Sequence, residues 1–343
     1  MQNRGLIGLF VVTLAAVIAA FFVARGGASA RTDPLVGTRV LPQVARGIDT
    51  VARVALVKGG VKTTLVLQGA DWTVEERGFY RANADKVHQM LLGLADLTYV
   101  EPKTRKPDLY PRLEVEDADK PGAKSTLVTI SDAQGSLLGE IIAGKHSVDQ
   151  LGGGNDGVYV RKPGDAQSWL ARGALDLSGT TADWLDKKIM DLPVAQVKSV
   201  VLTAAAGPEL SFGREKPGDK FALATPIPAG KKLKGDSALD DPAGVLGGLE
   251  LSDVQPAKTF DFPQQGVAQA RFESFDGLVV TVSVADKEGA HWARIAVTGT
   301  GDAAARAAAL TDRLQPWVFG IDDYQAKQLE TKLDDVVETP KAS

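Results

Sequence analysis

One short pattern of residues occurs twice in this 343-residue chain. Leu-[Ser/Thr]-x-Val-x-Pro stands at residues 97–102 and again at 251–256, and a glycine, Gly93 or Gly247, lies four residues before each copy. An internal repeat constrains architecture more firmly than local propensity does, because similar segments adopt similar structures. The pattern therefore predicts two copies of one structural unit.

The first half of the chain has the signals of an antiparallel sheet with one helix. Two strands, 51–57 and 63–67, are separated by Lys58-Gly59-Gly60 and form a predicted hairpin, with a third strand at 72–74. Asn83 or Asp85 can cap the next helix, whose apolar stripe consists of Val87, Met90, Leu91 and Leu94. Further strands are expected at 126–131, 137–143, 158–161 and 168–171.

The second half repeats this order of elements. A hairpin is expected at 197–202 and 209–212, a helix before the second copy of the pattern, and strands at 268–274, 278–285 and 292–297. Helices are also predicted from Thr181 to before Pro193, at 303–314 and from Asp322 to Val337.

The fold class is therefore α+β, with two mainly antiparallel sheets that each carry a packed helix. The expected divisions are an anchor at 1–25, a tether at 26–47, a first repeat with its connecting helix at 48–193, a second repeat at 194–320, and a C-terminal helix and tail at 321–343.

An uncharged apolar stretch runs from Gly5 to Ala24. As a helix it would span about 30 Å, which matches the hydrocarbon core of a bilayer. The alternative is a cleaved signal peptide, because Ala28-Ser29-Ala30 resembles a cleavage site, but the stretch exceeds the usual apolar region of such peptides. We expect a single-pass anchor in the inner (cytoplasmic) membrane with an extracytoplasmic body, although basic residues on both sides leave the orientation open.

Composition excludes several classes of function. The 39 Lys and Arg residues against 43 Asp and Glu leave a net charge of −4, so a basic field for nucleic acid is absent. The chain has no cysteine, which excludes disulfides, thiol nucleophiles and cysteine-ligated metals. Its three histidines, His88, His146 and His291, are too dispersed to predict a metal site. We expect His88 to be hydrogen-bonded beside the apolar stripe.

Each remaining motif has a simple structural interpretation. Gly299-x-Gly301-x-x-Ala304 resembles a dinucleotide fingerprint, but no second parallel strand is expected after its helix, and Asp302 is read as a cap. The glycine-rich segment 152–157 lacks the ligands of a calcium loop or a P-loop. Asp240-Asp241 and Asp334-Asp335 point apart on a helix. The basic runs 103–106 and 231–234 are expected to be solvated loops, with contact to anionic lipid or polymer as the alternative.

A set of aromatic and apolar motifs resembles a known bacterial family. These are Trp72-Thr73-Val74, Asp85-Lys86-Val87, Val158-Tyr159-Val160-Arg161, the stretch from Trp184 to Leu192, and Trp317, Phe319, Ile321 and Tyr324. Together with the N-terminal apolar stretch they resemble the family catalogued as domain of unknown function 4340. The resemblance implies no catalytic residues. It implies a membrane-anchored accessory protein, since members are commonly encoded beside gliding-motility-type ABC transporter components.

Two functions follow as hypotheses. The first is a non-enzymatic accessory or scaffold protein of an ABC-type export or gliding-motility-like complex, with the bilayer and transporter subunits as partners and without catalytic, metal or cofactor residues. The alternative is an envelope hydrolase or a ligand- or polysaccharide-binding domain whose site is not visible in the sequence. A concave pocket with strongly shifted carboxylates would favour the alternative.

Overall fold

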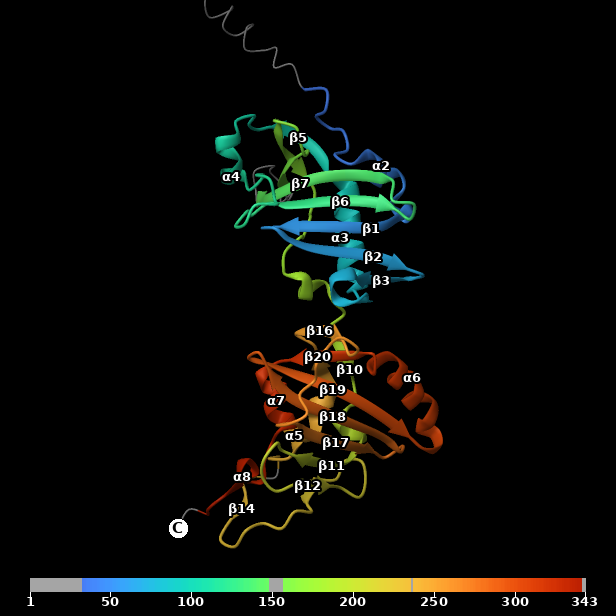
Figure 1. Ribbon diagram of the computed structural model, residues 1–343, viewed down its shortest axis with the longest axis vertical. Helices are drawn as coiled ribbons and strands as arrows, with labels where there is room; N and C mark the ends of the chain where they lie inside the picture. Colours follow the sequence, from blue (N-terminus) through green and yellow to red (C-terminus); the bar gives the residue numbers. More distant parts are fainter. Residues whose placement is uncertain (1–32, 148–156, 236, 341–343) are drawn as a thin grey trace, which may run out of the picture.

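The computed structural model describes residues 33–147, 157–235 and 237–340. They form two units stacked along the long axis of the molecule (Figure 1), each built on one large sheet. The described chain enters at the upper end, in the first unit, and its C-terminal part lies at the lower end, in the second unit. The α+β class with mostly antiparallel sheets and few helices is confirmed.

The first unit is a nine-stranded sheet in which all neighbouring strands are antiparallel. The predicted hairpins and strands are present. In spatial order the strands are β4 (Tyr80–Arg81), β3 (Asp71–Val74), β2 (Val61–Gln68), β1 (Val51–Lys58), β6 (Thr126–Asp132), β7 (Leu137–Ser147), β8 (Gly157–Arg161), β9 (Ser168–Arg172) and β5 (Thr98–Pro102).

Helix α3 (Ala84–Asp96) covers one face of this sheet. Asn83 is its N-cap, because its side-chain oxygen accepts a hydrogen bond from the backbone N–H of Lys86 at 3.0 Å. All four residues of the predicted stripe are buried. On the opposite face, η3 (Pro107–Leu109) and α4 (Tyr110–Leu113) help to cover a small second core of Tyr110, Val115, Ile142, Tyr159 and Leu170.

The segment that joins the units is not the expected helix. It has one turn of 3-10 helix, η4 (Thr181–Trp184), and then strand β10 (Lys188–Met190). Leu185 forms a β-bridge with Ala82 of the first unit, and β10 pairs with β15 (Leu249–Glu250) of the second. Pairing on both sides holds the linker extended, so tertiary contacts override its helical signals.

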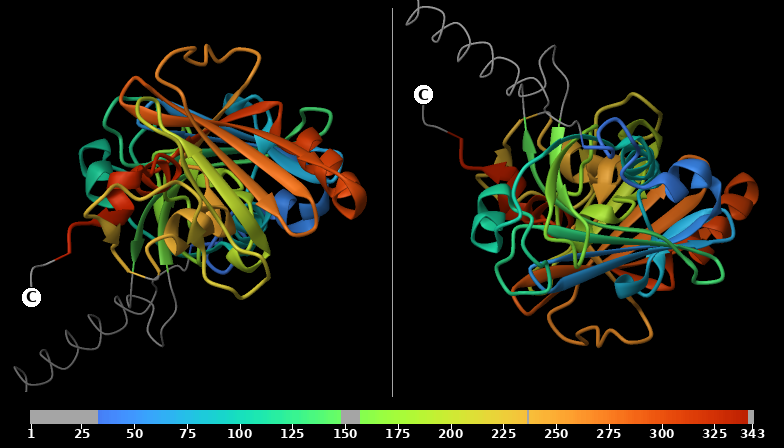
Figure 2. Two further views of the ribbon diagram at one scale, coloured as in Figure 1. Left: turned by 90° about the horizontal axis from the view of Figure 1, so that it is seen from below. Right: turned by 90° about the horizontal axis from the view of Figure 1, so that it is seen from above.

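The second unit is an eight-stranded antiparallel sheet. Its spatial order is β13 (Ala222–Leu223), β12 (Leu210–Gly213), β11 (Val197–Thr203), β17 (Ala268–Ser274), β18 (Leu278–Lys287), β19 (Ala290–Gly299), β20 (Trp317–Ile321) and β16 (Asp253–Pro256). The segment after β16 extends beyond this sheet (Figure 2) and contributes Phe260 and Phe262 to a small outer core with Ala285, Trp292 and Val318.

The helices of the second unit are shorter than expected, apart from α6 (Ala304–Leu314). The helix before the second copy of the pattern is reduced to α5 (Asp240–Gly244) and η6 (Val245–Gly248). The C-terminal helix is broken into α7 (Asp323–Leu329) and α8 (Leu333–Val336), and between them the Thr331 hydroxyl donates to the carbonyls of Lys327 and Gln328. Strand β21 (Val337–Glu338) then pairs with β14 (Lys232–Leu233).

The folded part of the chain starts earlier than Ile48. Val40, Leu41 and Val44 are buried, and α2 (Pro42–Arg46) packs against α3 and β7. The expected anchor at residues 5–24 lies outside the described residues. Within the described part of the chain, no helix is long and apolar enough to cross a membrane.

Candidate functional site

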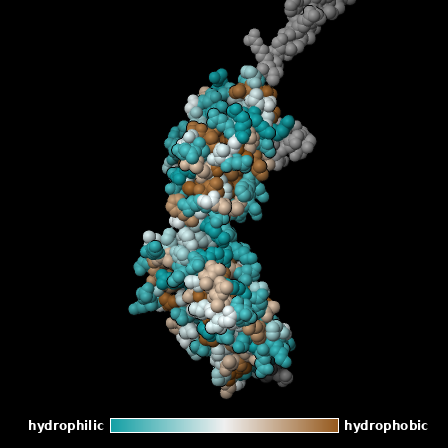
Figure 3. All heavy atoms as spheres, turned by 90° about the vertical axis from the view of Figure 1, so that its right-hand side faces the viewer, coloured by the Kyte–Doolittle hydropathy of each residue, from teal (hydrophilic) through white to brown (hydrophobic). Residues whose placement is uncertain are grey.

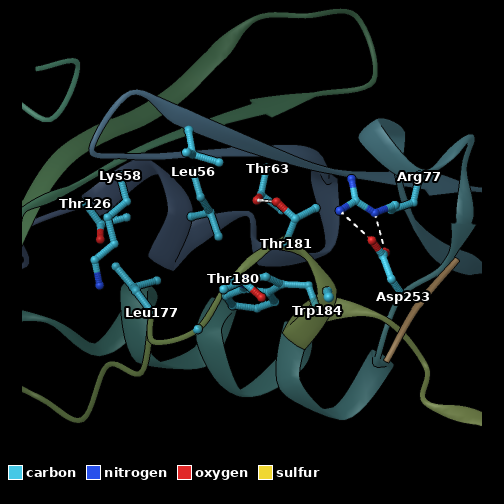
Figure 4. A pocket seen from close by; sticks show the side chains of 13 residues that line it. Leu56, Lys58, Thr63, Arg77, Thr126, Leu177, Thr180, Thr181, Trp184 and Asp253 are labelled. Carbon is cyan, nitrogen blue, oxygen red and sulfur yellow. Dashed lines mark hydrogen bonds and ion pairs between the residues drawn. The ribbon is translucent and has the colours of Figure 1, made fainter. Parts of the chain in front are cut away.

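A groove of about 720 Å³ lies between the first sheet and the linker (Figure 4). One wall is the turn end of the β1–β2 hairpin, with Leu56, Lys58 and Thr63, and the other is the segment Leu177 to Trp184. Lys58 is exposed, and its side chain has no ion-pair partner among the described residues. The groove continues beside β6, where Thr126 and Leu177 also line a smaller hollow.

Two threonines join the walls of the groove. The hydroxyl oxygens of Thr63 on β2 and Thr181 on η4 are 2.7 Å apart, and both side chains are buried. A hydrogen bond between buried hydroxyl groups satisfies both without water. This contact fixes the linker against the sheet at the middle of the groove.

The linker wall has its own local scaffold. Asp183 accepts hydrogen bonds from the backbone N–H and the hydroxyl of Thr180, at 2.7 and 2.9 Å. These bonds hold the pKa of the Asp183 carboxyl below its usual range, because they stabilise the charged form. The next residue, Trp184, is buried with the Lys86 ammonium 4.5 Å from its ring centroid. The turn and the ring together define this wall.

An ion pair between the two units closes one end of the groove. Arg77 of η2 (Glu75–Arg77) donates from Nε and Nη2 to the two carboxylate oxygens of Asp253, at 2.6 and 3.1 Å. Glu76 orients this turn, since it accepts hydrogen bonds from the backbone N–H and hydroxyl of Thr64. A two-pronged Arg–carboxylate pair has a defined geometry as well as charge attraction.

Apolar contacts between the units surround this ion pair. Gly78 packs so closely on Pro256 that a Cβ atom at this position would lie 2.4 Å from the proline Cγ. The rings of Tyr80 and Trp317 meet edge to face with centroids 5.0 Å apart. Burial, with the nearby charge of Asp186, raises the pKa of Tyr80 to about 12.

This groove is suited to binding. It offers threonine hydroxyls, an exposed ammonium group at Lys58 and an apolar wall that includes Trp184. Its one carboxylate belongs to Asp253 and is engaged by Arg77. Lys58 is therefore the charged side chain of the described groove lining that has no ion-pair partner in the described chain.

The topology around Gly299-x-Gly301-x-x-Ala304 differs from that of a dinucleotide-binding site. A strand, β20, follows α6, and Asp322 comes directly after it, but this strand is not the parallel one that a dinucleotide site needs. β20 pairs antiparallel with β19, whereas a dinucleotide site requires a parallel β-α-β unit. Gly299 instead permits close packing, since a Cβ there would lie 2.7 Å from the carbonyl oxygen of Ala303.

The acidic pairs lie away from the groove. Asp240 and Asp241 begin α5 and, with Asp322, line a separate hollow of about 480 Å³. Asp334 forms an ion pair with Lys231, which holds the pKa of that carboxyl below its usual range. Of segment 152–157, only Gly157 is among the described residues, as the first residue of β8.

The histidines lie on three different elements. His88, on α3, is exposed and makes no side-chain hydrogen bond within the described chain, so the expectation for it is wrong. His146 is exposed on β7. His291 lies between two carboxylates, with Nδ1 2.5 Å from Asp286 and Nε2 3.3 Å from Asp323. No group of three or more potential metal ligands comes together in the described parts of the chain.

Sequence reasoning missed the residues that join the units. Arg77 and Asp253 belong to segments with no local motif in common, and neither residue was singled out. The available signals were indirect. Asp253 and Pro256 lie within the second copy of the repeated pattern, and Trp317 lies within the terminal aromatic motif.

Comparison with known proteins gives one match. No curated protein and no solved structure matches the chain. The family described as a domain of unknown function, DUF4340, matches residues 72–259, which is more than half of the chain. The match runs from β3 to the segment after β16 and includes Arg77, the linker and Asp253. The chain therefore belongs to the DUF4340 family.

Proposed function

We propose that this protein is a membrane-anchored, non-enzymatic accessory or scaffold component of an ABC-type export or gliding-motility-like complex. The apolar stretch from Gly5 to Ala24 anchors it in the inner membrane, with the body outside the cytoplasm. The observation that carries the proposal is an elongated, internally braced body whose described chain enters at one end (Figure 1). Such a body presents docking surfaces at a defined distance from the bilayer.

The bracing between the two units supports a scaffold role. One continuous core extends from Val40 in the first unit through Leu185 and Ile189 of the linker to Val337 in the second. The Arg77–Asp253 pair, the Tyr80–Trp317 contact and a hydrogen bond of 2.7 Å from Arg313 to the carbonyl of Ile189 add specific contacts. Figure 3 shows the two lobes meeting at a narrower waist. A shared core resists independent motion of the lobes better than a polar interface does.

We also propose that the units arose by duplication. The strand order β3-β2-β1-β6-β7-β8-β9-β5 matches β13-β12-β11-β17-β18-β19-β20-β16. In both sheets the first strand has an irregularity after its first residue, at Val51/Arg53 and at Val197/Ser199. The prolines of the repeated pattern have corresponding partners, Pro102 opposite Trp169 and Pro256 opposite Trp317. Experimental coordinates in which α3 and α5–η6 fail to superpose on their sheets would contradict duplication.

Affinity purification of the full chain from detergent-solubilised membranes tests the accessory role. We expect ABC transporter subunits to copurify with it. The control is Leu14→Arg with Val17→Arg, which places two charges in the apolar stretch and should move the protein to the soluble fraction without those subunits. Purification without transporter subunits would contradict the role.

A mature chain beginning at Arg31, measured by mass spectrometry, would contradict the anchor.

The groove favours a second candidate function, ligand binding. Val61 lines the groove and the residue is 65% exposed, so a larger residue fits there without disturbing the core. If the groove binds a small molecule, native mass spectrometry of the purified full chain should show an added mass that Val61→Trp removes. An added mass that persists in Val61→Trp would place the ligand elsewhere.

A further inference from the structure

A basic loop follows β5 at the end of the molecule where the described chain enters. The entering chain runs along β5, since the Gly37 N–H donates to the Tyr99 carbonyl at 2.8 Å and the Val40 N–H donates to the Leu97 carbonyl at 2.9 Å. Both β5 and α4, which flank the basic loop, lie at this upper end in Figure 1. The sequence places the run Lys103-Thr104-Arg105-Lys106 between them.

The loop is held in place, and the charges of Arg105 and Lys106 remain exposed, whereas Lys103 pairs with Glu101 at 2.8 Å. The N–H groups of Lys103 and Thr104 donate to the Ser168 carbonyl and hydroxyl oxygens, at 2.8 and 3.1 Å. Arg105 and Lys106 are exposed, and their side chains form no ion pair or hydrogen bond within the described chain. Segment 101–112 carries four basic residues against two acidic ones. The loop therefore presents a fixed positive surface.

In the other basic run, at the opposite end, each of the three lysines has a partner in the C-terminal segment, and two of these partners are carboxylates. Lys231 pairs with Asp334, Lys232 pairs with Glu338 at 3.5 Å, and Lys234 donates to the carbonyl of Asp335 at 2.6 Å. These partners belong to the C-terminal segment 334–338, which packs beside the run through the β14–β21 pair. Two runs of similar composition thus differ in available charge, and the available charge lies at the N-terminal end.

The length of the preceding chain keeps that end near any bilayer that holds residues 5–24. Eight residues separate Ala24 from Asp33, the first described residue. At most about 3.5 Å per residue, they reach no farther than about 28 Å. Two of the eight, Arg25 and Arg31, are also basic. Electrostatic attraction acts within about 10 Å at moderate salt, and the preceding segment is short enough to let the loop come within that range of the headgroups.

We propose that the loop 103–106 docks on the headgroups of acidic phospholipids and sets the orientation of the body on the membrane. This inference rests on the proposed membrane anchor. Arginine and lysine bind phosphate oxygens, and each basic residue near an anionic surface strengthens binding by about fivefold. Removing the charges of Arg105 and Lys106 should therefore lower the docked population by about 25-fold relative to the undocked one.

Energy transfer to labelled lipid measures this docking. The full chain is reconstituted in nanodiscs of phosphatidylcholine, or of a two-to-one mixture with phosphatidylglycerol, with a headgroup acceptor. The absence of native cysteine allows a single donor dye at Asp108→Cys beside the loop or at Glu215→Cys in the second unit. We expect more transfer from position 108 in acidic discs than in neutral discs. The difference should vanish in about 0.5 M NaCl, where screening shortens the range of attraction to about 4 Å.

Two variants of equal charge change separate loop docking from general attraction. Arg105→Gln with Lys106→Gln should remove the lipid-dependent difference. Lys216→Gln with Lys327→Gln, which changes two exposed lysines of the second unit that form no ion pair in the described chain, should retain it. Equal energy transfer from position 108 in acidic and neutral discs would overturn loop docking. So would an equal loss of the lipid-dependent difference in both double variants. Neither result would contradict the anchor. A chain that does not remain with the discs would overturn the anchor itself.

Discussion

At the scale of single residues, Leu91 and Leu92 are neighbours on α3 in opposite environments. Leu91 is 4% exposed and packs in the main core, whereas Leu92 is 58% exposed. Leu91→Ala should leave a cavity and lower the free energy of unfolding by about 2–5 kcal/mol. Leu92→Ala removes the same atoms from the surface and should change it by about 0.5 kcal/mol or less. Urea unfolding measures both, and equal losses would contradict the assigned faces of α3.

His88, on the same helix, tests the non-enzymatic role. Its exposed side chain predicts that His88→Ala leaves the melting temperature nearly unchanged. If the protein is a scaffold, loss of function should follow loss of stability, so Leu91→Ala should impair complementation of a deletion strain more than His88→Ala does. A stable but inactive His88→Ala protein would contradict the proposed function.

Gly78 combines a backbone requirement with a close contact. Its φ of 65° is in the left-handed region, and a Cβ there would lie 2.4 Å from Pro256. Gly78→Ala should lower the free energy of unfolding by about 2 kcal/mol or more. Gly69→Ala is the control, because Gly69 has a φ of 64° with no atom within 4 Å and tests the backbone cost alone, about 1 kcal/mol. Equal costs at the two sites would mean that the Pro256 contact contributes nothing.

At the scale of secondary-structure elements, the η4 turn predicts a pH dependence. The lowered pKa of Asp183 means that its contribution to stability is complete above its unfolded pKa of about 3.9 and is lost as pH falls through the folded value. Asp183→Ala should lower stability by about 1 kcal/mol at neutral pH, and by progressively less below about pH 4. Thr180→Ala keeps the backbone donor and should have a smaller effect. A difference that stays constant down to about pH 2 in urea titrations would contradict this role.

Local patterns predicted most elements but not those determined by distant partners. Hairpin β1–β2, β3 and α3 with its Asn83 cap follow from turn residues, alternation and an apolar stripe. The helix predicted for the linker is wrong because Leu185 pairs with the first unit and β10 pairs with the second. These pairings outweigh the helical signals of the segment. The single C-terminal helix predicted from Asp322 to Val337 is wrong as well, because the chain leaves helical geometry between Leu329 and Leu333.

At the scale of the whole molecule, little of the candidate groove could be predicted. Its walls come from β1–β2, the linker and β16, and their approach depends on sheet pairing that no single segment encodes. The sequence indicates Thr181 only as the start of a predicted helix and Trp184 only as part of a motif of the family resemblance. The two copies of the repeated pattern lie at edge strands, β5 beside β9 in the first sheet and β16 beside β20 in the second.

The shared core predicts that the two units unfold together. Hydrogen exchange followed by mass spectrometry across a urea series should give the same unfolding midpoint for the paired strands β1 and β6 as for the paired strands β17 and β18. The reason is that one core continues through the linker. Arg77→Ala with Trp317→Ala removes the bidentate ion pair and the edge-to-face contact, so the two midpoints should separate. Arg53→Ala breaks a single-contact Arg–carboxylate pair, with Glu75, inside the first unit and should shift both midpoints together. Separate midpoints in the unmodified chain, or coincident midpoints in the double variant, would show that these contacts do not couple the units. The body would then bend between the two units instead of acting as a rigid spacer above the membrane.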